Sequence, residues 1–123
     1  MKASALSLFI LVLAAMLVGM ASQVASADEQ IPVSFTYKVY CSRCHGDAGK
    51  GDGPDAASLS TKPRDFADCA VMSKISDETI VKAIKNGGAA VGLSREMPAW
   101  GVALSNDKIG ALAKFVRTFC VKK

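Results

Sequence analysis

Three residues near the middle of the chain carry side chains whose spacing indicates chemistry. Cys41 and Cys44 are separated by two residues, and His45, the only histidine in the sequence, follows directly. On one helical turn, two thiols at this spacing can add to the two vinyl groups of a single haem, while the adjacent imidazole ligates the iron. The pattern therefore predicts one haem c, attached through Cys41 and Cys44, with His45 as the proximal ligand.

Two other interpretations of a Cys-x-x-Cys pair compete with haem attachment. A structural zinc site needs four ligands, usually from two such pairs, whereas positions 41–45 hold one pair and one histidine. A thioredoxin-like dithiol would lie in a βαβ unit, and no strong strand pattern surrounds this segment. Both alternatives are weaker than haem attachment.

The sixth coordination position of such an iron needs another ligand, because the sequence holds no second histidine. Methionine fills this position in His/Met cytochromes. Met97 is favoured because it lies in an irregular segment beside Pro98, which stiffens the backbone. Met72 comes just before a predicted helix among apolar residues, where filling the core is the simpler role. A lysine ligand, an external ligand and an open iron remain alternatives.

The N-terminal residues have the layout of a secretory signal peptide. Lys2 is followed by an apolar run from Leu6 to Met20, and the small residues Ala25–Ala27 then form a cleavage site. We expect residues 1–27 to be removed and residues 28–123 to form one small domain, exported to the periplasm. The alternative is an uncleaved membrane anchor, since the uncharged stretch is long enough to cross a bilayer; the protein would be on a membrane only in that case.

Cys69 and Cys120 remain after the haem has taken its pair of cysteines. An exported protein matures under oxidising conditions, where free thiols are a liability. We therefore expect a disulfide between Cys69 and Cys120. The alternative is two unrelated buried thiols, which are common for cysteine.

The charge balance excludes nucleic acid as a partner. The formal net charge is +4, and removal of Lys2 with the leader lowers it to +3. The basic residues are spread along the chain rather than clustered. At most, this excess favours docking to an acidic protein.

Helix signals define the elements that must position these groups. Pro32 suits the first turn of a helix that runs through His45. The glycine-rich residues 46–54 then exclude regular structure and predict a loop close to the haem. Ser76 and Ser105 are N-caps of two further helices.

The two later helices each present one apolar face. Residues Ile80, Val81 and Ile84 form the inner face of the helix after Ser76, which ends at Gly87. The helix after Ser105 carries an apolar stripe formed by Ile109, Leu112, Phe115, Val116 and Phe119. Three or more helices, long loops and no strand alternation predict an all-α domain packed around one covalently attached haem.

The motifs together resemble the class I monohaem cytochromes c of the bacterial periplasm. The resemblance rests on the haem motif at 41–45 and spans nearly the whole mature chain. Its other segments are Gly49–Pro54, Lys62–Phe66, Met97–Trp100 and the start of the last helix. The resemblance implies a small cytochrome c fold.

The resemblance also implies roles for three further residues. Pro54 would accept a hydrogen bond from the His45 imidazole through its carbonyl, which would fix the orientation of the ring. Arg64 and Trp100 would bond to or pack against the haem and its propionates. A solvated arginine and a core tryptophan are the alternatives for these two side chains.

With His45 and Met97 both on the iron, no substrate could coordinate. The expected role is therefore a one-electron carrier, not an enzyme, that acts as a monomer between unidentified redox proteins. One alternative is a haem enzyme or gas-binding sensor in which the sixth position is open or labile. Another is an electron-transfer subunit of a larger oxidoreductase complex.

Overall fold

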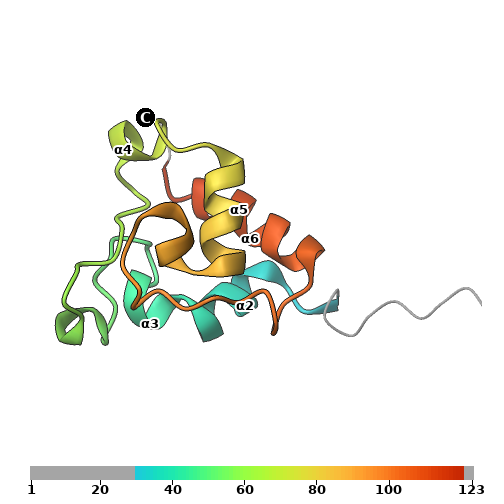
Figure 1. The fold of residues 1–123 in the computed structure, drawn as a ribbon. Coiled ribbons are helices and arrows are strands. Elements are labelled where there is room, and N and C mark those ends of the chain that lie inside the picture. The colour runs from blue at the N-terminus through green and yellow to red at the C-terminus, as the bar shows by residue number, and fades with distance from the viewer. Residues whose placement is uncertain (1–29, 121–123) are drawn as a thin grey trace, which may run out of the picture.

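Three longer helices form the frame of the protein (Figure 1). They are α2 (Val33–Tyr40), α5 (Asp77–Asn86) and α6 (Asn106–Arg117). The computed structural model describes residues 30–120, which contain no strand. The shorter elements are α3 (Ser42–His45), α4 (Cys69–Met72) and 3-10 turns at Ala56–Ser58 and Gly88–Val91. The predicted all-α fold with long irregular connections is confirmed.

Helix α5 begins and ends where the sequence predicts. The Ser76 hydroxyl accepts a hydrogen bond from the Thr79 backbone N–H at 3.2 Å, which satisfies one of the free donors of the first turn. Gly87 follows the last helical residue with a φ of 84°, a backbone conformation that favours glycine. Ile80 and Ile84 are buried, so the predicted inner face is confirmed for these two residues.

Helix α6 is the central element of the core. The Ser105 hydroxyl accepts the Lys108 N–H at 3.2 Å and caps the first turn. Ile109, Leu112 and Val116 are buried against α2 and α5, and each buried side chain of this size stabilises the fold by about 1.5–3 kcal/mol. Helix α6 therefore holds α2 and α5 in fixed positions around it.

The N-terminal helix differs from the prediction in two details. The expected continuous helix through His45 is divided at Cys41, whose φ of −115° lies outside the usual helical range. Pro32 is the N-cap of α2, with a ψ of 137°, rather than a residue of the first turn. The Cys41 N–H still bonds to the Tyr37 carbonyl at 2.9 Å, and the His45 N–H bonds to the Cys41 carbonyl at 2.9 Å, so backbone hydrogen bonds connect α2 to α3.

Tyr37 joins α2 to two other parts of the chain. Its ring packs on Phe115 and Phe119, with ring centroids 5.3 and 5.1 Å away. Its hydroxyl donates a hydrogen bond to the Gly46 carbonyl at 2.8 Å, and burial raises the pKa of this phenol. The start of the glycine-rich loop is thereby held against the core.

The segment that contains α4 is joined to the end of α6. The Sγ atoms of Cys69 and Cys120 lie 2.03 Å apart and form a disulfide in the structure. The guanidinium of Arg117 donates hydrogen bonds to the carbonyls of Met72 and Ile75 and to the Asp77 carboxylate. These contacts position the chain that leads into α5.

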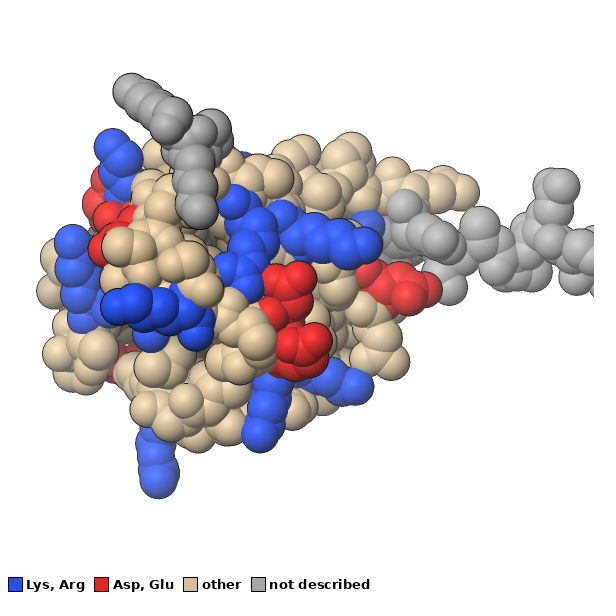
Figure 2. Space-filling view, turned by 90° about the horizontal axis from the view of Figure 1, so that it is seen from above, with Lys and Arg blue, Asp and Glu red and all other residues tan. Residues whose placement is uncertain are grey.

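The predicted signal peptide, residues 1–27, lies outside the described residues. Within residues 30–120, no helix combines the length and the hydropathy that a membrane crossing requires. Figure 2 shows lysine and arginine side chains spread over one face with acidic residues between them, as the sequence predicts.

Candidate haem-binding site

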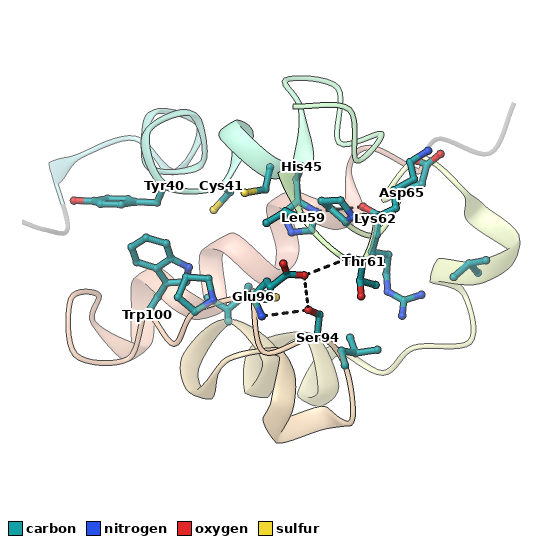
Figure 3. Close-up of a pocket in the computed structure, with 18 of the residues that line it drawn as sticks. Tyr40, Cys41, His45, Leu59, Thr61, Lys62, Asp65, Ser94, Glu96 and Trp100 are labelled. Atoms are coloured by element: carbon teal, nitrogen blue, oxygen red, sulfur yellow. Dashed lines mark hydrogen bonds between the residues drawn. The ribbon is translucent and has the colours of Figure 1, made fainter. Parts of the chain in front are cut away.

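One cavity brings together most of the candidate site residues. It has a volume of about 410 Å³, which lies within the usual range for cofactor sites. Cys41, Cys44 and His45 line it from α3 and the preceding turn, and Met97 and Trp100 line it from the loop before α6. Figure 3 shows this arrangement, with side chains from several loops pointing toward the same space.

The cavity has the chemistry that a covalently bound haem needs. Cys41 and Cys44 are free, half-buried thiols, and His45 is the last residue of α3, the short helix that contains Cys44. Apolar side chains, such as Leu59, supply much of the remaining wall. The residues present therefore fit two thioether links and one imidazole ligand on one side of a flat apolar group.

The two cysteines lack the character of a redox-active dithiol. Burial raises the pKa of the Cys41 thiol to about 11, and the neighbouring Cys44 adds to this shift. Burial also raises the pKa of Cys44. Reactive Cys-x-x-Cys dithiols instead have a lowered pKa, because the thiolate is their nucleophile. The electrostatics of the site thus argue against the thioredoxin-like alternative.

The imidazole of His45 is oriented by two contacts. Its Nδ1 lies 3.2 Å from the backbone carbonyl oxygen of Arg64, and its ring stacks on Phe66 with the centroids 4.4 Å apart. Burial lowers the pKa of His45, and the hydrogen bond to Arg64 opposes this shift only in part. In the neutral ring, a proton on Nδ1 donates to the carbonyl and leaves the Nε2 lone pair for a metal.

The expectation for Pro54 is wrong. Pro54 does not accept the His45 hydrogen bond; the carbonyl of Arg64 does. Pro54 lies in a separate shallow groove beside Arg43 and Asp47. The physical reason is that the chain doubles back after the glycine-rich loop, so the segment that starts at Pro63 reaches the imidazole.

Arg64 and Trp100 both line the cavity and both are half-buried. The contact that the structure shows between Arg64 and the site is made by its backbone. The Trp100 ring packs on Tyr40, with centroids 5.1 Å apart, and the Trp100 backbone N–H donates a hydrogen bond to the Ile84 carbonyl at 2.9 Å. Trp100 therefore helps to close the cavity between α2 and α5.

The two methionines of residues 28–123 have different environments. Met97 is half-buried in the cavity wall, and its carbonyl accepts the Gly88 N–H at 3.0 Å. Met72 is only 1% exposed and packs in the hydrophobic core among the buried residues of α5 and α6. The core role predicted for Met72 is confirmed, and Met97 is the methionine that faces the cavity.

Sequence reasoning missed Glu96, which joins two loops at the cavity. Its carboxylate accepts hydrogen bonds from the Ser60 N–H at 2.9 Å, the Ser60 hydroxyl at 2.7 Å and the Thr61 N–H at 3.3 Å. The Ser94 hydroxyl donates a further bond at 3.1 Å (Figure 3). These bonds, first that from the Ser60 backbone, lower the pKa of Glu96. No local pattern connects residues 36 positions apart.

Comparisons with known proteins support a c-type cytochrome. Residues 34–116 match the family described as cytochrome C oxidase, cbb3-type, subunit III. Among solved structures, the chain is similar to the KustC0563 c-type cytochrome at 28% sequence identity and a TM-score of 0.60, over 74% of this chain and 100% of that chain. No curated protein matches the sequence significantly. The family match includes every candidate site residue.

Proposed function

This chain belongs to the cytochrome C oxidase, cbb3-type, subunit III family of c-type cytochromes, and from this we propose that it is an exported one-electron carrier with His45 and Met97 as axial ligands. Haem-based electron transfer is the general activity of c-type cytochromes. The attachment residues, the ligand pair and the location in the periplasm are the parts of the proposal that go beyond the family.

The observation that supports the ligand pair most strongly is the set of residues that line one cavity. His45 and Met97 line the same cavity as the two free thiols Cys41 and Cys44. Met97 is also the one described methionine in that wall, since Met72 is buried in the core. A thioether from the loop before α6 and an imidazole from α3 are thus available to one metal.

The protein's own groups would hold, orient and seclude the cofactor. A bound haem supplies one-electron chemistry, because its iron can exchange between the ferric and ferrous states. His45 would stay neutral and directed by the Arg64 carbonyl, and Trp100 would help to limit the access of water. With both axial positions filled by side chains, no position would remain for a substrate, so the role would be transfer between redox proteins rather than catalysis.

A pair of matched substitutions tests the ligand assignment. The purified ferric holoprotein should contain one haem per chain and show the weak band near about 695 nm that methionine sulfur gives on haem iron. Met97→Leu should abolish this band, whereas Met72→Leu should retain it. A wild-type protein with high-spin iron that binds carbon monoxide rapidly would instead support a haem enzyme or gas sensor.

A second candidate is a subunit of a larger electron-transfer complex. The description of the matching family, which names an oxidase subunit, favours it. Its chemistry at His45 and Met97 would be the same, and only the partner would differ. Co-purification at low and at physiological salt separates the two candidates, because electrostatic docking of a mobile carrier weakens as ionic strength rises.

A further inference from the structure

Two loops that are far apart in the sequence border the cavity. One loop contains Ser60 and Thr61 and continues to Arg64, whose carbonyl bonds to His45. The other contains Ser94 and Met97. Each loop therefore carries one of the groups that determine how the proposed axial ligands are placed.

Glu96 is the residue that connects these loops. Three of its hydrogen bonds reach across to Ser60 and Thr61, at 2.7–3.3 Å. A fourth, from the Ser94 hydroxyl, comes from its own loop, and that hydroxyl also accepts the Glu96 N–H at 3.2 Å. Hydrogen bonds to a charged acceptor are stronger than neutral ones, and four that converge on one carboxylate restrict its position closely.

The position of Glu96 in the chain couples this restraint to Met97. Met97 is the next residue, and its own backbone makes a longer bond to the Ser94 carbonyl at 3.4 Å and one from Gly88 at 3.0 Å. A thioether is a weak, uncharged metal ligand, so its binding depends on how well the protein holds it in place. A restraint on the adjacent backbone is therefore an efficient way to keep the sulfur in the cavity.

We propose that Glu96 is a positioning residue that keeps the Met97 sulfur on the haem iron by tying the Met97 loop to the Ser60–Thr61 backbone. This inference rests on the proposed His45/Met97 ligation. Without the Glu96 bonds, the loop would move outward, the sulfur would leave the iron more often, and an external ligand would enter the vacated position.

The binding of imidazole to the ferric holoprotein tests this role, because an added ligand binds only when Met97 has left the iron. In Glu96→Ala, we expect imidazole to bind faster, by on the order of tenfold, and the band near about 695 nm to weaken. Glu96→Gln keeps one acceptor oxygen for the Ser60 N–H, so it should give values between those of the wild type and Glu96→Ala.

Glu78→Ala is the matched control. Glu78 is also an exposed glutamate whose pKa hydrogen bonds lower, but it lies in the first turn of α5 and not in the cavity wall. We expect imidazole to bind this variant as it binds the wild type. Should Glu96→Ala not fold, Glu96→Gln and Ser60→Ala provide the same comparison.

The possible outcomes separate this inference from the proposed function. If the wild type shows the methionine band and Glu96→Ala and Glu96→Gln bind imidazole at the wild-type rate, the role of Glu96 is refuted and the ligation stands. An equal acceleration in Glu78→Ala would also refute it. If the wild type itself lacks the methionine band, the ligation and the role of Glu96 are refuted together.

Discussion

The backbone carbonyl of Arg64 lies 3.2 Å from Nδ1 of His45, although the two residues are 19 positions apart. Through this contact, the segment that follows Pro63 orients the His45 imidazole. A hydrogen bond from the far nitrogen of a metal-bound histidine raises the basicity of the ligand, so the contact bears directly on the redox potential of the proposed haem.

Replacement of Pro63 should raise the midpoint potential. Pro63→Ala loosens the backbone before the Arg64 carbonyl and weakens its bond to His45, which makes the imidazole a poorer electron donor and favours the ferrous state. Pro54→Ala is the matched control, since Pro54 lies in another groove, and its potential should equal that of the wild type. Redox titration with optical detection measures the midpoint potential of both variants. A changed potential in Pro54→Ala but not in Pro63→Ala would contradict the role of the Arg64 carbonyl.

Arg64→Ala should leave the His45 hydrogen bond in place, because the acceptor belongs to the backbone. In the ferrous protein, the Nδ1 proton of His45 should remain visible by NMR with slow exchange. Loss of this signal in Arg64→Ala would mean that the guanidinium, and not the carbonyl, governs the ring.

The bridge between Cys69 and Cys120 should be present in the oxidised protein and should stabilise it. The cysteines are 51 positions apart, and closing a loop of that size is worth about 4 kcal/mol in the chain-entropy model. The double variant Cys69→Ser/Cys120→Ser should lose free energy of unfolding of this order in denaturant titration. Mass spectrometry of the unreduced protein provides the chemical check, and two alkylatable thiols would contradict the bridge.

Removal of the Arg117 side chain should cost about 2–3 kcal/mol of stability, because hydrogen bonds from a charged donor are lost and the carbonyls of Met72 and Ile75 are left without it. Asp77→Ala removes only the exposed end of the same network, where the carboxylate is 68% exposed, and should cost less than about 1 kcal/mol. Denaturant unfolding of Arg117→Ala and Asp77→Ala tests this order. Equal losses of the free energy of unfolding would mean that the stabilisation comes from the Arg117–Asp77 ion pair and not from the bonds to the carbonyls.

Two glycines should respond to alanine in opposite directions. A Cβ at Gly53 would lie 2.3 Å from the Arg43 carbonyl oxygen, so Gly53→Ala must displace backbone and should destabilise the protein by more than about 1 kcal/mol. A Cβ at Gly110, inside α6, would meet nothing within 4 Å, and Gly110→Ala should stabilise it by about 0.5–1 kcal/mol. Thermal unfolding of both variants measures the signs.

The sequence by itself determined the features that depend on neighbouring residues. Cys41, Cys44 and His45 are close in the chain, so their spacing alone predicted haem attachment. Ser76, Gly87 and Ser105 act on the helix ends beside them. The apolar repeat predicted the buried residues Ile109, Leu112 and Val116 of α6, whereas Phe115 is half-buried and Phe119 lies beyond the end of the helix. Local hydrogen bonds and helical periodicity are visible in a linear pattern.

Only the tertiary structure decided which distant loops meet at the cavity. The acceptor for His45 is a backbone carbonyl, and carbonyls are alike in every residue, so no residue type could distinguish Arg64 from Pro54. In the sequence, nothing distinguishes Glu96 from other glutamates. Its role becomes visible only in the folded protein, where Ser60 and Thr61 donate hydrogen bonds to its carboxylate. The packing of α2 and α5 on α6 determines where the irregular segments between the helices lie. It therefore decides which residues of these segments meet at the cavity.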